Sequence, residues 1–132
     1  RPARLASTET TTGKARMRRG ERWERHAEAR LVAQGMQCVA RNHCCRGGEI
    51  DLVMLAHDSL VFVEVRYRRG QRFGSALESI DARKQQRLIR AAQDFLVRHP
   101  EYANHACRFD VVALHGDAKH PQCDWIAGAF SA

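Results

Sequence analysis

Hydrophobic and polar positions alternate along the chain with two different periods. Apolar residues recur at helical spacing in residues 21–34 and again in residues 81–98, which predicts a helix in each range. Strands are expected in five shorter β-prone runs, at 37–41, 49–55, 60–67, 107–114 and 124–126. This order of helices and strands predicts an α/β domain with a mixed sheet flanked by helices.

Turn residues refine this prediction. The polar stretch at 42–48 is expected to be a turn, and residues 57–59 join two strands so tightly that they should form an antiparallel hairpin. Asp81 stands at the expected start of the second helix as its N-cap. We expect residues 1–19, which are polar and then basic, to form a disordered tail ahead of one folded domain over 20–132.

Composition constrains the class of protein and its partners. The chain has 132 residues, 44% of them hydrophobic and 28% charged, which is typical of a soluble single domain, and its apolar runs are far shorter than the roughly 20 residues that a membrane helix needs. Its five cysteines are an odd number without a CxxC pair, so a reducing cytoplasm is expected rather than disulfides or zinc. The net charge of +7 favours nucleic acid or an anionic membrane surface, and a basic chain that binds nothing is an equal alternative.

Two acidic residues interrupt the most hydrophobic strands. Alternation places Asp51 and Val53 on one face of their strand and Ile50 on the other, while Glu64 and Arg66 share a face of the next strand. Neighbouring desolvated carboxylates are costly unless a cation compensates, and Mg²⁺ held by carboxylates, water and phosphate oxygens is such a cation. This set suits metal-assisted phosphodiester hydrolysis, and a strand-edge ion pair between Glu64 and Arg66 is the alternative.

Several spaced motifs extend over about residues 20 to 130, and these are Trp23-Glu24, 48–53 (GEIDLV), 61–66 (VFVEVR), Phe73-Gly74, Lys84, 108–112 (RFDVV) and Ala129-Phe130. Together they resemble the YraN family, an uncharacterised family of the restriction-endonuclease-like superfamily related to the Holliday-junction resolvases. The resemblance implies a restriction-endonuclease-like mixed β-sheet flanked by helices. By analogy with resolvases, which make two symmetric cuts in a junction, it also implies a homodimer.

The resemblance further implies a Mg²⁺ or Mn²⁺ site. Its metal ligands match Asp51 and Glu64, supported by Glu24 of the first helix, and Arg66 stands where the family pattern has a lysine. Arginine stays charged and is a poor general base, so Lys84 is the candidate to supply the missing amine, and a contact of Lys84 with phosphate alone is an equal alternative. The expected catalytic set is therefore Glu24, Asp51, Glu64, Arg66 and Lys84.

Basic residues near this set predict contacts with phosphate. The candidates are Arg68, Arg69, Arg72, Arg83 and Arg87. Tyr67 and Phe73 lie among them and offer a stacking contact, although an ordinary solvated loop is an equally good interpretation. We expect a metal-dependent endonuclease that acts on branched or structured DNA. The alternative is a non-catalytic nucleic-acid-binding module that kept the fold and lost its lysine.

Overall fold

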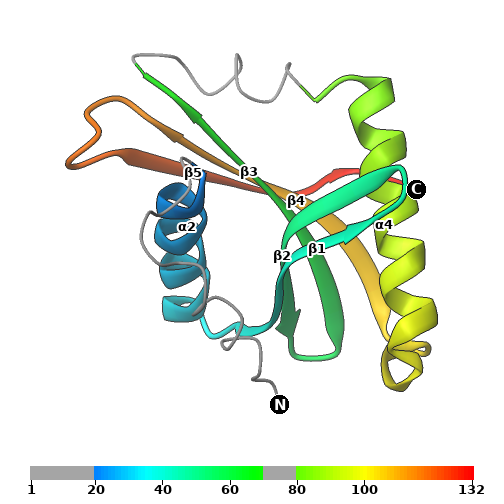
Figure 1. The fold of residues 1–132 in the computed structure, drawn as a ribbon. Helices are drawn as coiled ribbons and strands as arrows, with labels where there is room; N and C mark the ends of the chain where they lie inside the picture. The colour runs from blue at the N-terminus through cyan, green and yellow to red at the C-terminus, as the bar shows by residue number, and fades with distance from the viewer. Residues whose placement is uncertain (1–19, 70–79) are drawn as a thin grey trace, which may run out of the picture.

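The computed structural model describes residues 20–69 and 80–132, and the expected tail at 1–19 lies outside them. Both expected helices and all five expected strands are present (Figure 1). In chain order the elements are α2 (Glu21–Ala33), β1 (Gln37–Cys45), β2 (Gly48–Ala56), β3 (Ser59–Arg68), α4 (Ala82–Arg98), the 3-10 helix η1 (Pro100–Tyr102), β4 (Ala106–His115) and β5 (Gln122–Phe130). Neither described α-helix is long and apolar enough to span a lipid bilayer.

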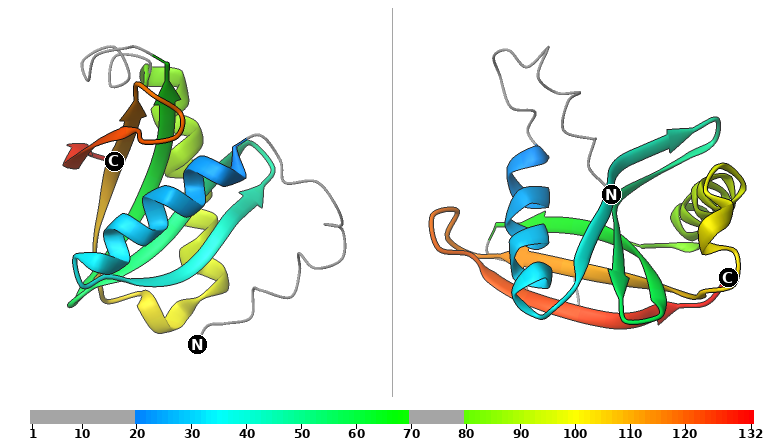
Figure 2. Two further views of the ribbon diagram at one scale, coloured as in Figure 1. Left: turned by 90° about the vertical axis from the view of Figure 1, so that its left-hand side faces the viewer. Right: turned by 90° about the horizontal axis from the view of Figure 1, so that it is seen from below.

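The five strands form one mixed sheet in the order β1-β2-β3-β4-β5. Strands β3 and β4 are parallel, and the other neighbours are antiparallel. A parallel pair needs a crossover connection, and α4 lies within the segment that links β3 to β4. Helices α2 and α4 cover opposite faces of the sheet (Figures 1 and 2). This architecture is consistent with the expected restriction-endonuclease-like fold.

Each face of the sheet is buried under one helix. Under α4 lie the apolar side chains of one alternating set, among them Val53, Leu60, Phe62, Phe109 and Val111, packed on Leu88 and Phe95. Under α2 lie those of the other set, among them Leu52, Met54, Val61, Val63, Val112 and Leu114, packed on Ala27 and Leu31. The strict alternation along β3 explains why its sequence reads as a continuous apolar run, since both of its faces are covered.

The β1–β2 hairpin bends away from the rest of the sheet, and its turn lies against α4 (Figures 1 and 2). The backbones approach so closely there that a Cβ atom on Gly48 would lie 2.1 Å from the carbonyl oxygen of Arg87. Ile50 consequently packs in the same cluster as Val53, under α4. The expected placement of Ile50 on the opposite face was therefore wrong, because the bend in β2 interrupts simple alternation.

Two strands are longer than the sequence pattern predicted. Strand β1 continues through the expected polar turn to Cys45, with Asn42 at a positive φ of 49° within it. Strand β5 runs from Gln122 to Phe130 instead of over three residues, with a register shift opposite Phe109 and Val111. Polar composition was thus a poor guide at both edges of the sheet, because edge strands expose one row of backbone and many side chains to water.

Candidate active site

Strands β2 and β3 separate at the position of the two candidate carboxylates. Their pairing ends at Leu52 opposite Val63. Beyond this point β2 remains paired with β1, and β3 remains paired with β4. Asp51 and Glu64 are the first residues past this fork, so the division of the sheet sets them between two diverging backbones.

The side chains of Asp51 and Glu64 are in direct contact. The backbone N–H of Val65 donates a hydrogen bond of 2.8 Å to Asp51 Oδ2, taking the place of a bond to the β2 backbone. A side-chain hydrogen bond joins Asp51 and Glu64. Glu64 is buried, with 5% of its surface exposed. A hydrogen bond between two carboxyl groups requires that one of them carry a proton.

Burial and proximity disfavour ionisation of this pair. Burial, and after it the neighbouring Asp51, raises the pKa of Glu64 to about 8. Burial also raises the pKa of Asp51, an effect that the Val65 amide, Glu24 and Lys84 partly oppose. The metal-free pair therefore holds a proton at neutral pH that exposed carboxyl groups would lose. Ionisable groups whose pKa values are shifted by burial and by a neighbouring charge are typical of functional sites.

Two cationic side chains approach Glu64 from different elements. Arg66 Nε lies 3.2 Å from Glu64 Oε2, and Lys84 Nζ lies 3.6 Å from the same oxygen. The Arg66 contact is an ion pair by distance but not a hydrogen bond, because Arg66 Nε is buried without an aligned acceptor. Asp81 begins α4 as its N-cap, accepting 2.9 Å from the Lys84 N–H, and this cap fixes Lys84 in the first turn.

Glu24 reaches the site from the other face. A side-chain hydrogen bond joins Glu24 of α2 to Asp51. The start of α2 is held on the end of β3 by Trp23, whose ring stacks on Tyr67 at 4.0 Å between centroids, and Arg22 lies over the Trp23 ring at 4.6 Å. The structure thus brings together all five residues of the expected catalytic set, from α2, β2, β3 and α4.

The donor chemistry of Asp51 and Glu64 fits a hard divalent cation. Within residues 20–69 and 80–132, no three His, Cys, Asp or Glu side chains are arranged to hold one metal ion. Mg²⁺ does not require such a cage, because proteins bind it through one or two carboxylates while water and phosphate oxygens complete its shell. The buried Glu64 and the half-buried Asp51 offer that pair of ligands, and Glu24 adjoins them through Asp51.

Comparison with known proteins identifies the family. The model of UPF0102, an uncharacterised protein family, matches residues 23–114. The chain belongs to UPF0102. It is 54% identical to a UPF0102 protein of Pseudomonas putida strain GB-1, covering 86% of this chain and 93% of that protein. It is 44% identical to a UPF0102 protein of Alcanivorax borkumensis strain SK2, covering 96% of each. These names state no activity, and they confirm the resemblance drawn from the spaced motifs.

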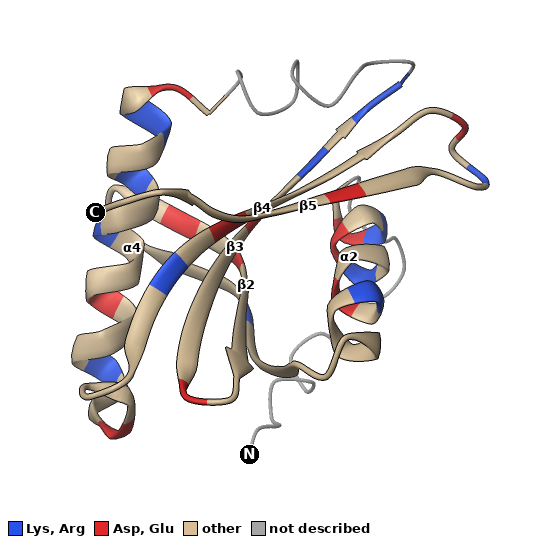
Figure 3. Ribbon diagram, turned by 180° about the vertical axis from the view of Figure 1, so that it is seen from behind, with Lys and Arg blue, Asp and Glu red and all other residues tan. Residues whose placement is uncertain are grey.

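Of the five basic residues expected to contact phosphate, the four that the structure describes form a basic rim at the end of β3 and on α4, the elements that carry Arg66 and Lys84. Arg68 and Arg69 follow the site at the end of β3, and Arg83 and Arg87 are exposed on the first turns of α4. Figure 3 shows Lys and Arg positions at both places, with acidic positions between them on the sheet. Arg72 and Phe73 lie outside the described residues.

Tyr67 has a different role from the stacking contact that its sequence neighbourhood suggested. Its ring stacks on Trp23, and its hydroxyl donates 2.6 Å to the carbonyl oxygen of Gly116. One face of the ring and the hydroxyl group are thus engaged by the protein itself. The sequence offered one clue to this role, the aromatic residue Trp23. The spacing of Trp23 and Tyr67 along the chain did not predict that α2 would lie across the end of β3.

Asp110 is a buried carboxylate to which the sequence pattern assigned no role. It is 0% exposed, and Arg108 donates to both of its oxygens at 3.0 and 3.3 Å. Trp125 Nε1 donates at 2.8 Å, and the Gly128 N–H donates at 3.0 Å. Arg108, two residues earlier on the same strand, was the available signal. These bonds join β4 to β5 where their register shifts, so Asp110 is a structural residue.

Proposed function

We propose that this protein is a metal-dependent endonuclease that hydrolyses phosphodiester bonds in DNA, in branched or structured substrates. The proposal is supported chiefly by one observation. Glu64 is buried and Asp51 is half-buried just past the fork of β2 and β3, and their burial raises the pKa of both carboxyl groups, which a divalent cation bound between them would offset. Placing two carboxyl groups together away from water costs free energy, and a ligand that needs both carboxylates explains this cost most simply.

The side chains around the carboxylates have complementary roles in this proposal. Mg²⁺ or Mn²⁺, when bound, would polarise the scissile phosphate and lower the pKa of a bound water. Asp51 and Glu64 would ligate it, and Glu24 would orient Asp51 through their hydrogen bond. Arg66 keeps its charge and its fork of donors, which suits a phosphate oxygen. Lys84 is the amine that can exchange a proton near Glu64.

The basic rim would position the nucleic acid. Arg68, Arg69, Arg83 and Arg87 flank the carboxylates on two elements, and their charges would meet phosphates on either side of the scissile bond. The chain carries a net charge of +7, so binding should weaken steeply as salt is added.

One observation favours a second candidate, a non-catalytic nucleic-acid-binding module. Arg66 occupies the position of the expected lysine and is paired with Glu64 at 3.2 Å. An arginine there keeps its positive charge and cannot act as a base. The two candidates differ in metal dependence, because a binding module would hold DNA equally well in EDTA.

The decisive experiment incubates the protein with labelled duplex, single-stranded and four-way-junction DNA, in Mn²⁺ or in EDTA. We expect cutting of the junction in Mn²⁺ and none from the Asp51→Asn/Glu64→Gln variant. The matched control is Asp58→Asn/Glu101→Gln, which makes the same charge change at two exposed positions and should cut normally. Salt-sensitive binding without cutting would establish the binding module. Neither binding nor cutting would overturn both candidates.

A further inference from the structure

The turn of the β1–β2 hairpin and the outer face of α4 bring arginines together from distant parts of the chain. The turn consists of Arg46 and Gly47, between Cys45 and Gly48. A Cβ atom on Gly47 would lie 2.9 Å from Arg90 Cδ and 3.0 Å from Arg90 Nη1, so the Arg90 side chain lies across the turn. Arg46 and Arg90 are therefore neighbours at the contact between hairpin and helix.

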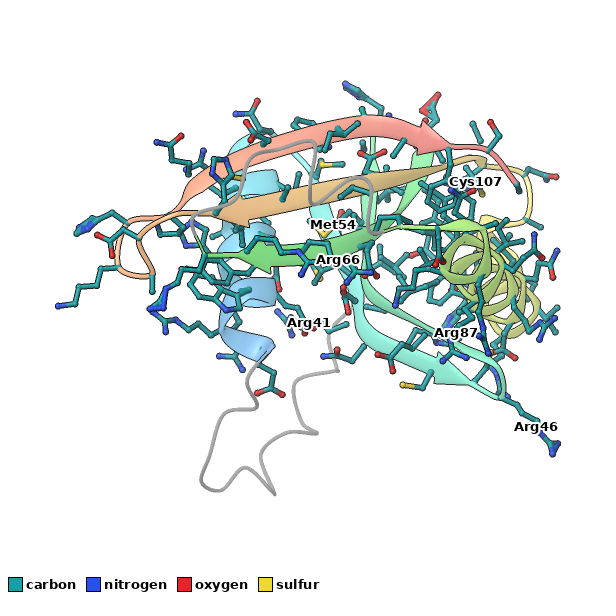
Figure 4. All side chains as sticks on the ribbon, turned by 90° about the horizontal axis from the view of Figure 1, so that it is seen from above. Arg41, Arg46, Met54, Arg66, Arg87 and Cys107 are labelled. Atoms are coloured by element: carbon teal, nitrogen blue, oxygen red, sulfur yellow. The ribbon has the colours of Figure 1, made fainter. Side chains whose placement is uncertain are left out.

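These arginines are exposed and have no acidic partner within residues 20–69 and 80–132. Arg46, Arg87 and Arg90 are all exposed. Among the described residues, no ion pair joins any of the three to an Asp or Glu side chain. Figure 4 shows Arg46 pointing outward from the hairpin turn, with Arg87 on the same side of the molecule. Their positive charges are thus available to a partner.

The same face of α4 leads back to the carboxylate site. Arg83, Arg87 and Arg90 are spaced four and three residues apart, so they lie along one face of the helix. Arg90 lies seven residues after Arg83, which is a rise of about 10 Å along the helix axis. Duplex DNA carries a negative charge about every 1.7 Å of its axis with both strands counted, so a duplex segment of this length carries about six phosphate charges.

We propose that Arg46 and Arg90 form a second phosphate-binding surface, which holds duplex DNA where the hairpin turn meets the arginine-bearing face of α4. This surface rests on the DNA-binding part of the proposed function and does not depend on cleavage. The hairpin turn and the helix each contribute one guanidinium, so the surface exists only because Gly47 and Gly48 let the turn lie against α4. Guanidinium groups suit phosphate oxygens through their planar fork of donors.

An anionic membrane is a poorer partner for this surface. A helix that lies in a lipid interface exposes apolar side chains beside its basic ones. The apolar face of α4 is instead buried on the sheet through Leu88, Ala91, Ala92 and Phe95. The large exposed hydrophobic residues of the described chain are Val32, Val97 and Trp125, and none belongs to the hairpin turn or to the turns of α4 that carry these arginines.

The test compares Arg46→Gln/Arg90→Gln with the wild type and with Arg25→Gln/Lys119→Gln, a control that removes two exposed positive charges from α2 and the β4–β5 turn. Binding to a 30-bp duplex is measured in EDTA by fluorescence anisotropy at several salt concentrations. Two lost phosphate contacts should reduce the slope of log K against log salt by about 1.8. Between 50 and 200 mM salt, the wild type should then lose about tenfold more affinity than the variant. The control should keep the wild-type slope.

The surface would be overturned by equal slopes for the variant and the wild type, a result that leaves the proposed function standing. A wild type without salt-dependent DNA affinity would overturn both. Vesicles of phosphatidylserine and phosphatidylcholine are measured in parallel. Vesicle binding that is lost in Arg46→Gln/Arg90→Gln, with an unchanged DNA slope, would assign the surface to lipid and overturn the proposal.

Discussion

Asp110 and Glu64 lie one register position apart in the sheet, yet their surroundings differ in the donors that face each carboxyl group. Asp110 is paired in register with Val63, the residue before Glu64. It accepts two hydrogen bonds from Arg108, one from Trp125 and one from Gly128. Glu64 has Asp51 as a hydrogen-bond partner and two cations at ion-pair distance.

The comparison shows what distinguishes a structural carboxylate from one that is available to a ligand. A buried charge persists when its lone pairs are satisfied by fixed donors, and Asp110 is satisfied in this way within β4 and β5. Glu64 is buried to a similar degree, but the fork of β2 and β3 gives it a second carboxyl group instead of amide donors. The first site stabilises the fold, and the second costs stability that a bound cation can recover.

The largest effect is expected from Asp110→Asn. The substitution keeps the shape of the side chain but leaves Arg108 without its counter-charge, and breaking such a pair typically costs 3–5 kcal/mol. Because Arg108 is 35% exposed, water would compensate part of this loss, and we expect a decrease of about 3 kcal/mol in the free energy of unfolding. Urea unfolding at pH 7 in EDTA measures it.

The matching substitution at the Asp51–Glu64 site should have the opposite effect on stability or none. Asp51→Asn, under the same conditions, should leave the free energy of unfolding equal to that of the wild type or higher, because it removes one of two competing carboxyl groups. Equal losses for Asp110→Asn and Asp51→Asn would show that both sites are structural, and the comparison would fail.

The second effect is a pH dependence that Glu64→Gln should remove. With a pKa of about 8, folded Glu64 retains a proton that the unfolded chain loses above its ordinary value of 4.5. The free energy of unfolding of the metal-free wild type therefore falls as the pH rises between these values, by at most about 1.4 kcal/mol per pH unit. Since Asp51 shares the proton, we expect a fall of about 2 kcal/mol from pH 6 to pH 8.

Urea unfolding in EDTA at intervals between pH 5 and pH 9 measures this slope. Glu64→Gln should flatten the profile and be more stable than the wild type at pH 8. The control is Glu101→Gln, at a side chain that is 64% exposed, and its profile should run parallel to that of the wild type. A parallel profile for Glu64→Gln would contradict the expected pKa.

A smaller effect is expected from Trp125→Phe on the side of Asp110. The phenyl ring keeps most of the packing but removes the indole N–H, which donates 2.8 Å to Asp110. Three donors remain on that carboxylate, so we expect a loss of about 1 kcal/mol. Thermal and urea unfolding measure it, and Mn²⁺ binding should be unchanged. Weaker Mn²⁺ binding by Trp125→Phe would mean that the two carboxylate sites are coupled through the sheet.

The sequence was sufficient to predict the elements and the opposition of Asp51 and Glu64. Helical periodicity located α2 and α4, and a short turn between β-prone runs placed the two acids on adjacent strands. The face of Ile50 was predicted wrongly, because the fork and the bend in β2 depend on the approach of α4 to Gly48, a contact between distant segments.

The candidate site was predictable residue by residue but not in its geometry. The resemblance identified Glu24 and Arg66 as members of the candidate site. For Lys84 two interpretations remained, an amine that serves the site or a residue that only contacts phosphate. Spacing along the chain cannot give the distance between a helix and a strand that precede and follow a long connection, and this distance is what the N-cap at Asp81 sets. Asp110 was missed for the same reason, since two of its donors come from β5.

The smallest expected effect distinguishes how much each of the two cations beside Glu64 lowers the pKa of that carboxyl group. Arg66 is the nearer, at 3.2 Å against 3.6 Å for Lys84, but Lys84 lowers the pKa of Glu64 more. We give the greater weight to Lys84, because an ammonium is a compact charge whereas a guanidinium spreads its charge over a plane. Lys84→Gln should therefore raise the pKa of Glu64 further than Arg66→Gln, as followed by NMR titration of the Glu64 side-chain carboxyl carbon in EDTA. Lys119→Gln, at an exposed turn, should leave the titration unchanged. A larger shift in Arg66→Gln would mean that the arginine, and not an amine from α4, balances the charge of Glu64.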